Sequence, residues 1–252
     1  MKIGLVQFSP AWENPEESIL NAEDLLKTSS GKFDALIFPE MTLTGFTMNS
    51  EKFAEEIDGI STQYFMKLSG RLKTNIFGGI IEHDGKNIFN SLVHFDNGII
   101  KARYRKIHPF SFSNEDRNYS AGDEKVITTI DETKIGLSIC YDLRFPELYR
   151  LYVKERTDIL IDIANWPIPR IEHWKTFLKA RAIENQCFMI GVNRVGSDPF
   201  HQYNGCSAVF DPMGSQIVFA ENEEKIIEVV IDLDLVNSTR TKLPFLQDIK
   251  LI

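Results

Sequence analysis

Short apolar runs alternate with longer stretches of mixed polarity along most of the chain. Residues 2–8 and 34–38 are apolar runs of strand length, and the second is typical of a strand that is buried on both faces. Between them, Asn14-Pro15 precedes a stretch in which apolar side chains recur every three to four residues. This spacing predicts an amphipathic helix that has the proline in its first turn. The alternation of strands and helices predicts an α/β fold.

The rest of the chain continues this alternation. Two strand-like runs, 88–95 and 99–105, flank Asp96-Asn97-Gly98, which is a strong signal for a β-hairpin. We expect further strands near residues 75–82, 125–130, 134–139, 158–163, 187–194, 206–211 and 225–232, and helices at 61–73, 146–156 and 171–185. No low-complexity linker or repeat interrupts this order, which indicates one domain. The hairpin and the late run of strands imply antiparallel pairs, so we expect a mixed sheet.

Composition argues against several classes of function. The 252 residues include 28 Lys and Arg against 36 Asp and Glu, a net charge of −8, which disfavours general binding to nucleic acid. No apolar stretch approaches the roughly 20 residues of a membrane span, and the amino terminus resembles a first strand rather than a signal peptide. The three cysteines contain no CxxC pair. We therefore expect reduced thiols in a cytoplasmic protein, and neither a disulfide framework nor a zinc ribbon.

Three residues with reactive side chains each come at the carboxyl end of a predicted strand. They are Glu40, Lys106 and Cys140. Ligand sites of open α/β sheets usually lie at the carboxyl ends of the strands. Each residue taken singly is a weak signal, but three different functional groups in the same local setting indicate a site.

Cys140 is the candidate nucleophile. It stands at a turn between a strand and a helix that begins with Pro146, where backbone N–H groups and the helix dipole favour the thiolate. A thiolate in such a position is suited to covalent catalysis. The alternative is a small residue of the core, which is the interpretation we prefer for Cys187 and Cys206 because both lie inside apolar strands.

Glu40 and Lys106 suit the proton-transfer and electrostatic parts of such chemistry. A carboxylate that faces an apolar pocket is a candidate general base, and a fixed ammonium stabilises a developing oxyanion. The alternatives are a solvated glutamate at a strand end and a solvated basic edge, since other basic residues surround Lys106. His108 or His173 could instead form a Cys–His pair with Cys140, although a lone histidine is more often structural.

Around these residues the sequence resembles the nitrilase superfamily of carbon–nitrogen hydrolases. Members have a glutamate after a hydrophobic strand, a lysine in a Tyr-Arg-Lys-x-His context and a cysteine in Cys-Tyr-Asp-x-Arg-Phe-Pro-Glu. Residues 36–40, 104–108 and 140–147 match these motifs. The likeness continues through residues 165–167, 180–186 and 211–214, so it covers nearly the whole chain in the same order.

This resemblance implies a four-layer αββα sandwich, in which two mixed sheets pack face to face with helices outside. It implies that Cys140 is the nucleophile, Glu40 the base and Lys106 the cation that stabilises the oxyanion. A second glutamate in the loop after the lysine completes the site, and Glu115 has the family's spacing. No metal or organic cofactor is required. The resemblance also implies a homodimer, and we expect a hydrolase domain over residues 1–236 and a carboxyl-terminal tail, 237–252, that takes part in dimer packing.

Within the superfamily, three stretches are similar to bacterial omega-amidases: residues 164–167, 181–186 and 191–196. These enzymes hydrolyse the terminal amide of 2-oxo dicarboxylic acid monoamides, such as 2-oxoglutaramate and 2-oxosuccinamate, to the 2-oxo diacid and ammonia. The similarity therefore implies a small-molecule amide substrate that carries a carboxylate.

That carboxylate needs a cation. The candidates are Arg144, four residues after the nucleophile, and Arg170 and Arg194. For Arg144 the alternative is an ion pair with Glu147 or Asp142, which would stabilise the turn without contacting substrate. If Arg144 binds the substrate carboxylate, neutralising it should weaken the binding of anionic substrates and leave uncharged amides little affected.

Two further residues are expected in the binding site. Trp166, which follows a predicted strand, is expected to form a wall of the pocket, with a place in the core as the alternative. The backbone N–H of Tyr141, directly after the nucleophile, is expected to join Lys106 in stabilising the oxyanion.

Three rival functions remain open at this point. One is hydrolysis of a different amide, a nitrile or a carbamoyl amine by a member of the same superfamily. Another is a catalytically silent binding or assembly module, against which the intact Glu40, Lys106 and Cys140 argue. The third is a Cys–His thioesterase, whose activity would not depend on Lys106.

Overall fold

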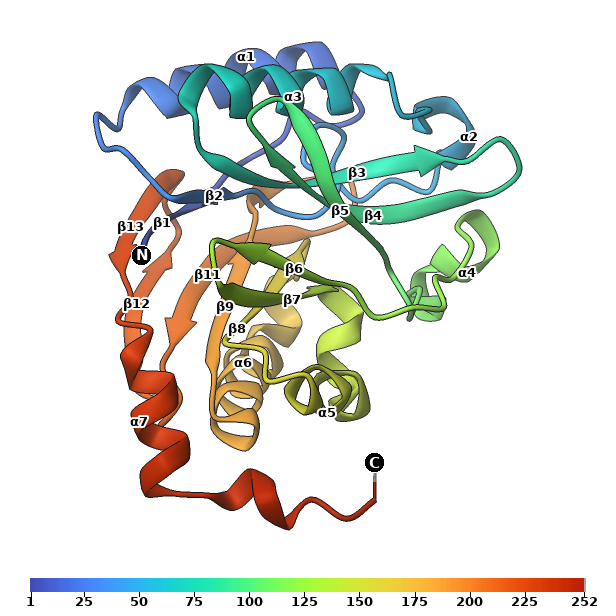
Figure 1. Ribbon diagram of the computed structural model, residues 1–252. Helices are drawn as coiled ribbons and strands as arrows, with labels where there is room; N and C mark the ends of the chain where they lie inside the picture. Colours follow the sequence, from blue (N-terminus) through green and yellow to red (C-terminus); the bar gives the residue numbers. More distant parts are fainter. Residues whose placement is uncertain (252) are drawn as a thin grey trace.

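Two β-sheets lie face to face between two layers of helices in the computed structural model, which describes residues 1–251 (Figure 1). The first sheet has the spatial order β13 (Lys225–Val230), β1 (Lys2–Gln7), β2 (Ala35–Ile37), β3 (Asn75–His83), β4 (Ile88–Asp96) and β5 (Ile99–Arg105). The second has the order β10 (Val195–Ser197), β11 (Gln202–Phe210), β9 (Phe188–Asn193), β8 (Ile159–Ala164), β7 (Thr133–Ile139) and β6 (Ile127–Ile130), with β12 (Gln216–Glu221) paired to β11. The expected αββα sandwich is confirmed.

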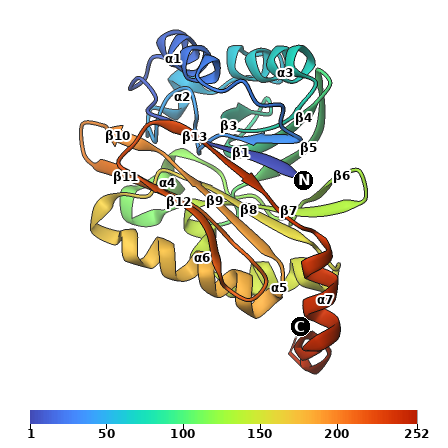
Figure 2. The same ribbon diagram turned by 90° about the vertical axis from the view of Figure 1, so that its left-hand side faces the viewer.

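Each sheet is covered on its outer face by a pair of helices. Helices α1 (Pro15–Lys27) and α3 (Ile60–Leu72) cover the first sheet, and α5 (Pro146–Lys154) and α6 (Ile171–Asn185) cover the second (Figures 1 and 2). The α-helices α2 (Ser50–Phe53) and α4 (Glu115–Asn118) and the 3₁₀ helices η1 (Ser111–Ser113), η2 (Cys140–Arg144) and η3 (Ile168–Arg170) are short. Over residues 1–251, no helix combines the length and the apolar character needed to cross a membrane.

The sandwich follows from the two-residue period of its strands. In β2, Ala35 and Ile37 face the core shared by the two sheets, whereas Leu36 belongs to the cluster beneath α1 and α3. In β1, Leu5 and Val6 divide in the same way. Both faces of these strands are apolar because a helix layer covers one face and the other sheet covers the second.

Both sheets are mixed, as expected. β1, β2 and β3 are parallel, while β3, β4 and β5 form antiparallel hairpins. The β4–β5 turn has positive φ angles at Asn97 (48°) and Gly98 (81°), which the Asn-Gly pair tolerates and the strand twist favours. Two strands were not expected: β10 is only three residues long, and β12 is an edge strand with mostly exposed or half-exposed side chains.

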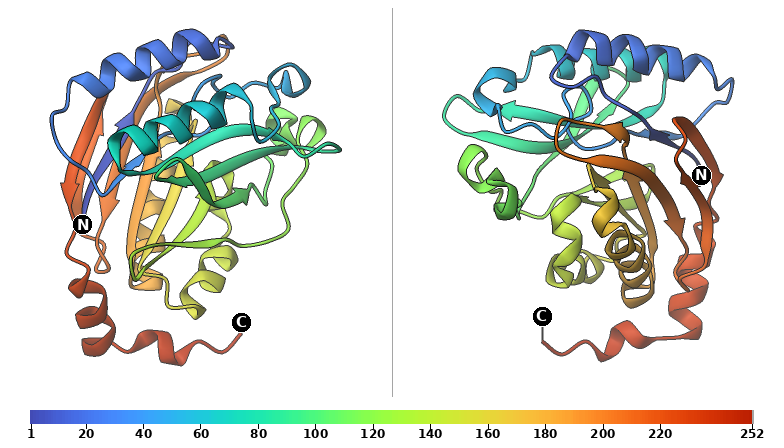
Figure 3. Two further views of the ribbon diagram at one scale, coloured as in Figure 1. Left: turned by 45° about the horizontal axis from the view of Figure 1, so that its top comes forward. Right: turned by 180° about the vertical axis from the view of Figure 1, so that it is seen from behind.

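The chain ends in helix α7 (Asp234–Lys242) and the 3₁₀ helix η4 (Phe245–Asp248), which project from the sandwich (Figures 2 and 3). Helix α7 was not expected from the sequence, and the boundary that we predict after residue 236 falls inside it. The side chain of Arg240 anchors the helix to the body by donating to the carbonyl oxygens of Thr157 and Gln186. Residue 252 of the predicted tail lies outside the described residues.

Candidate active site

The side chains singled out from the sequence gather at one end of the sandwich because their strands point the same way. β7 and β8 are parallel, so Cys140, which follows β7, lies beside Asn165, which follows β8. In the other sheet, β5 runs in the direction of β2 because the chain reverses twice between β3 and β5. The strands that precede Lys106 and Glu40 therefore end on the same side of the sheet. Glu115 begins helix α4, in the loop after Lys106.

Lys106 is buried between two carboxylates. Its Nζ lies 2.9 Å from Oε1 of Glu40 and 2.8 and 3.0 Å from the two carboxyl oxygens of Glu115. The side chains of the three residues are at most 1% exposed. Burial alone lowers the pKa of Lys106, but the charges of Glu115 and Glu40 outweigh it and hold the pKa well above its ordinary value. The lysine is therefore a permanent ammonium.

Glu115 is held as firmly as the lysine. Its Oε1 accepts from Asn90 Nδ2 at 2.8 Å, and its Oε2 accepts from the backbone N–H of Phe110. Burial raises the pKa of Glu115, Lys106 opposes this, and the charge of Glu40 raises it again. Among residues 1–251 no group of three or more His, Cys, Asp and Glu is arranged to hold a metal ion. The cation of this carboxylate cluster is the lysine.

Glu40 is surrounded by donors. Its Oε1 accepts from Asn90 Nδ2 at 2.7 Å as well as from Lys106, and its Oε2 accepts from the backbone N–H of Asn165 at 2.8 Å. The expectation that Glu40 faces an apolar pocket is therefore wrong. The carboxylate is buried, but its immediate neighbours are polar, and they fix its orientation.

Cys140 adopts an unusual backbone conformation at the start of η2. Its φ of +51° lies in the left-handed region, and its backbone N–H donates to Asp162 Oδ1 at 2.9 Å. Burial raises the pKa of the Cys140 thiol well above its ordinary value, and Glu40 raises it further, while Lys106 opposes. The expectation that the turn favours the thiolate is wrong, because η2 separates Cys140 from the helix that begins at Pro146 and burial outweighs the effect of that helix. Burial therefore favours the neutral thiol over the thiolate.

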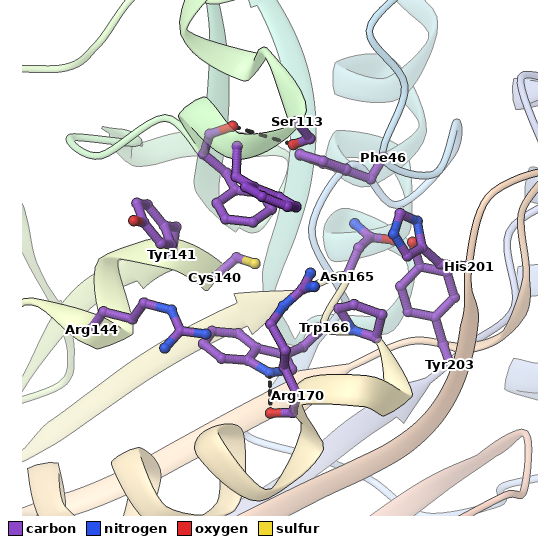
Figure 4. A pocket seen from close by; sticks show the side chains of 13 residues that line it. Phe46, Ser113, Cys140, Tyr141, Arg144, Asn165, Trp166, Arg170, His201 and Tyr203 are labelled. Carbon is purple, nitrogen blue, oxygen red and sulfur yellow. Dashed lines mark hydrogen bonds between the residues drawn. The ribbon is translucent and has the colours of Figure 1, made fainter.

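A pocket of about 170 Å³ opens onto Cys140. Figure 4 shows the sulfur pointing into it, with Arg144, Arg170 and Trp166 on the side opposite Phe46 and Ser113. Its aromatic wall consists of Phe46, Phe110, Phe112, Tyr141, Trp166 and Tyr203. The Phe46 ring also lies 5.4 Å from Nζ of Lys106, so it contacts both the pocket and the buried ion cluster.

Two arginines line this pocket. Neither Arg144 nor Arg170 forms a salt bridge within residues 1–251, and the guanidinium of Arg144 lies 4.8 Å from the ring centre of Trp166. Burial and the nearby charge of Arg170 lower the pKa of Arg144. The alternative ion pair with Glu147 or Asp142 is not formed. The third candidate, Arg194, is buried outside the pocket lining.

The histidines proposed for a Cys–His pair are engaged elsewhere. His108 donates its backbone N–H to Asp142 Oδ1 and contacts the same oxygen through Nδ1, at 2.9 and 2.7 Å. His173 lies 3.3 Å from the guanidinium nitrogens of Arg144. Neither lines the pocket, whereas His201 does. This arrangement does not favour a Cys–His thioesterase.

Three site residues were missed in the sequence. Asn90, in the middle of β4, bridges Glu40 and Glu115, and no local signal marks it. Asn165 lies in a stretch that resembles the family, but its hydrogen bonds to Glu40 depend on how the two sheets meet. Asp162 is an acidic residue inside the apolar strand β8, and that contrast was the one available signal.

Comparisons with known proteins show the family of the chain. The sequence model described as "Carbon-nitrogen hydrolase" matches residues 2–241. The chain therefore belongs to the carbon–nitrogen hydrolase family, as the resemblance to the nitrilase superfamily implied.

Individual relatives align over almost their full lengths. The chain is 34% identical to the 2-oxoglutaramate amidase of Bacillus subtilis, with 98% of this chain and 97% of the relative covered. It is 30% identical to the omega-amidase YafV of Escherichia coli K12, with 98% and 96% covered. Among solved structures, XC1258 from Xanthomonas campestris, described as a CN-hydrolase superfamily protein with an arsenic adduct in the active site, superposes with a TM-score of 0.95 at 33% identity. The match covers 100% of this chain and 98% of that one.

Proposed function

We propose that this protein is an amidase with Cys140 as its nucleophile, and that it hydrolyses the terminal amide of 2-oxo dicarboxylic acid monoamides such as 2-oxoglutaramate and 2-oxosuccinamate. The observation that carries the proposal is a thiol in a pocket with two arginines that have no acidic partners in residues 1–251, within reach of the charges of the buried Glu40–Lys106–Glu115 cluster. The relatives named 2-oxoglutaramate amidase and omega-amidase support the choice of substrate.

The first step is attack of Cys140 Sγ on the amide carbonyl. Because burial keeps the thiol protonated, a base must remove its proton as the C–S bond forms. Glu40 is that base in this proposal, since its charge acts on the thiol and its carboxylate is held by Asn90 and Asn165. A positioned base typically contributes about a hundred- to ten-thousandfold to the rate.

The negative charge that develops on the carbonyl oxygen needs donors. Lys106 supplies a permanent ammonium, and the backbone N–H of Tyr141 supplies the second donor. The preceding N–H, that of Cys140, is already bound to Asp162 Oδ1 at 2.9 Å and so does not serve as this donor. Loss of one such donor typically costs around 3 kcal/mol of transition-state stabilisation.

The remaining steps return the enzyme to its starting state. The proton on Glu40 passes to the departing nitrogen, ammonia leaves, and a thioester to Cys140 remains. Glu40 then removes a proton from water as the water attacks the thioester, and the acid product is released with the thiol restored. Glu115 holds Lys106 in place through both halves of the reaction.

The pocket suits a substrate with an anionic end. Arg144 and Arg170 place two guanidinium groups on its wall without a protein carboxylate to neutralise them in the described chain. Trp166 forms part of the same wall and packs against Arg144, which limits the directions that the guanidinium can take. A carboxylate bound here would lie on the far side of the pocket from the aromatic ring of Phe46 (Figure 4).

Ammonia release from a substrate panel tests the proposal. The panel contains 2-oxoglutaramate, glutamine, asparagine, a nitrile and a carbamoyl amine, so a preference for another member would identify a different carbon–nitrogen hydrolase activity. We expect 2-oxoglutaramate to be preferred. We also expect Cys140→Ala to lose both turnover and the acyl adduct that mass spectrometry detects on the quenched wild-type enzyme. Turnover that persists in this variant, or no ammonia from any compound with the wild type, would contradict the proposal and, in the second case, favour a silent binding module.

We further infer that two copies of the chain associate and that the protein works in the cytoplasm. The outer helices expose apolar side chains, Leu151 on α5 at 42% and Ile183 on α6 at 46%, and the expected carboxyl-terminal tail would add to the packing across a dimer. The three cysteines are free thiols, which suits a reducing compartment. Light scattering with and without residues 237–252, and fractionation of cells, measure these two properties.

A further inference from the structure

Asp162 lies directly behind the nucleophile. Its Oδ1 accepts the backbone N–H of Cys140 at 2.9 Å. Its Oδ2 lies 2.7 Å from Ser138 Oγ and 3.0 Å from the hydroxyl oxygen of Tyr149. All three side chains are fully buried, and within residues 1–251 no salt bridge reaches Asp162. The turn that carries the nucleophile therefore rests on an acidic residue that has no cation of its own.

The protons available to this cluster can be counted. Four short oxygen–oxygen contacts are present: Ser138 Oγ to the Ile161 carbonyl at 2.9 Å, Ser138 to Asp162 at 2.7 Å, Tyr149 to Ser138 at 2.8 Å and Tyr149 to Asp162 at 3.0 Å. Each needs one proton between its two oxygens, and a carbonyl can only accept. Ser138 and Tyr149 bring two protons, so an ionised Asp162 would leave two of the four contacts as oxygen lone pairs facing each other.

A proton on Asp162 improves this count. Asp162 then donates to Tyr149, Tyr149 donates to Ser138, and Ser138 donates to the carbonyl of Ile161, so that three contacts become hydrogen bonds in one continuous chain. Buried polar groups are hydrogen-bonded in native proteins with few exceptions. The arrangement of oxygens therefore favours the neutral acid.

The charged surroundings of Asp162 favour the same state. Burial raises the pKa of Asp162 well above its ordinary value, and the charge of Asp142 adds to this, although the hydrogen bonds from Ser138 and Tyr149 oppose it. The other titratable groups that face the cluster are Cys140 on the adjacent turn and Tyr149 on α5. Arg181 of α6 lies 5.2 Å from the ring of Tyr149, but its guanidinium is bound to the Leu143 carbonyl and to Glu184.

We propose that Asp162 is a positioning residue that acts as a neutral carboxylic acid: its Oδ1 holds the N–H of Cys140 and thereby the left-handed turn of the nucleophile, while its proton enters the Tyr149–Ser138 chain. This inference rests on the proposed function only in taking Cys140 as the nucleophile. It has one consequence for the site: Asp162 adds no further buried negative charge beside the thiol of Cys140.

Asparagine at this position reproduces the neutral acid. In Asp162→Asn the side-chain oxygen still accepts the Cys140 N–H, and the two amide protons reach Ser138 and Tyr149, so all four contacts have a proton. Asp162→Ala removes both functions. We expect Asp162→Ala to lose at least about tenfold in kcat, the order of one lost hydrogen bond to a buried group, and Asp162→Asn to restore most of that loss.

Asp142, two residues after the nucleophile, provides the matched control. Its oxygens face donors: the backbone N–H groups of Ile139 and His108, the ring nitrogen of His108 and the hydroxyl of Tyr104. In Asp142→Asn, the side-chain NH₂, itself a donor, would face two of these donors. Asp142→Asn is therefore expected to lose at least about tenfold in activity, in contrast to Asp162→Asn, because it leaves buried donors without acceptors.

Carbon-13 NMR of protein labelled at the aspartate carboxyl carbons measures the protonation state directly, without reference to turnover. The resonance that disappears in Asp162→Asn should have the chemical shift of a protonated acid and should not titrate near neutral pH. A carboxylate shift for that resonance would overturn the inference even if the alanine variant does not fold. The two proposals can fail separately. If the resonance has the shift of a protonated acid but the wild-type protein releases no ammonia from any amide, the proposed function is wrong, whereas the conclusion that Asp162 is a neutral acid is kept.

Discussion

Glu40 and Asn165 are 125 residues apart in the sequence, and Asn165 donates to Glu40 at both its carboxylate and its backbone. The backbone N–H of Asn165 binds Glu40 Oε2 at 2.8 Å, and its Nδ2 binds the Glu40 carbonyl oxygen at 2.8 Å. Glu40 follows β2 of the first sheet and Asn165 follows β8 of the second. These bonds therefore join the two sheets at the site and fix the proposed base in relation to the proposed nucleophile.

Replacing Glu40 by glutamine should uncouple turnover from thiol reactivity. Without a base, kcat should fall by roughly a hundred- to ten-thousandfold. The charge of Glu40 raises the pKa of Cys140, so its removal lowers that pKa and increases the thiolate fraction at neutral pH. Alkylation of Cys140 by iodoacetamide, followed by mass spectrometry, should therefore be faster in Glu40→Gln than in the wild type.

A matched control for this variant is Glu147→Gln, an exposed glutamate close to the nucleophile in the sequence. This variant should change neither kcat nor the rate at which iodoacetamide alkylates Cys140. Slower alkylation in Glu40→Gln than in the wild type would mean that the negative charge does not act on the thiol in the way described.

Replacing Lys106 by methionine should damage both activity and stability. The oxyanion loses its ammonium, at a cost of about a hundred- to a thousandfold in kcat. Two buried carboxylates also lose their shared cation, and breaking a buried ion pair in this way typically costs about 3 kcal/mol or more in the free energy of unfolding. Chemical denaturation and ammonia release measure the two effects.

The pH dependence separates the two roles of Lys106. Without the ammonium, burial and Glu40 raise the pKa of Glu115 further, so the folded state of Lys106→Met binds more protons than the unfolded state. Its stability should therefore recover as the pH falls toward the ordinary range of a carboxyl group. Lys106→Met/Glu115→Gln should recover stability at neutral pH but not activity, and a fully active double variant would contradict the role of the lysine.

Neutralising the pocket arginines should act on anionic substrates selectively. Arg170→Gln and Arg144→Gln should each raise KM for 2-oxoglutaramate by about tenfold or more, because a hydrogen bond to a charged group contributes about 1.5–3 kcal/mol. An uncharged aliphatic amide should be affected little by either change. The control is Arg71→Gln, which breaks a surface ion pair with Glu23 and should change KM for neither substrate. Equal losses on both substrates would assign Arg144 and Arg170 a structural role instead.

Acid should destabilise the sandwich through His94. This histidine of β4 is buried against the ring of Phe77, between Thr128 of the second sheet and Asn75. Burial lowers the pKa of His94 from 6.5 to about 4, and the charge of Lys101 contributes to the shift. In the unfolded chain this histidine is protonated below about pH 6.5, whereas in the folded chain it stays neutral until about pH 4. The free energy of unfolding therefore decreases as the pH falls through this window, by at most about 3 kcal/mol.

His94→Gln should remove this part of the acid sensitivity. Thermal unfolding measured across the same pH window should show a flatter curve than that of the wild type. His83→Gln, at the partly exposed end of β3, serves as the control and should keep the wild-type slope. An unchanged slope in His94→Gln would show that other groups cause the acid sensitivity.

The sequence predicted most helices and strands because their signals are local. Helix α6 (Ile171–Asn185) has the bounds expected from its pattern, and the Asn97-Gly98 turn forms the expected hairpin. Of the elements that were missed, α7 has a weak apolar pattern and projects from the body, whereas β12 has an apolar run of only four residues and lies at an edge. Their existence depends on the partner strand or surface against which they form.

For the candidate site, the residues themselves determined which chemical groups come together: a thiol, an ammonium and a carboxylate at strand ends, and a second carboxylate in the loop after Lys106. Only the tertiary structure decided their states. Burial and the charge of Glu40 favour the neutral thiol at Cys140. Glu40 meets amide donors rather than an apolar pocket, because Asn90 lies in β4 and Asn165 follows β8. Hydrogen bonds and desolvation depend on distances between atoms far apart in the chain, and strand register and sheet packing set those distances, whereas residue type and spacing do not.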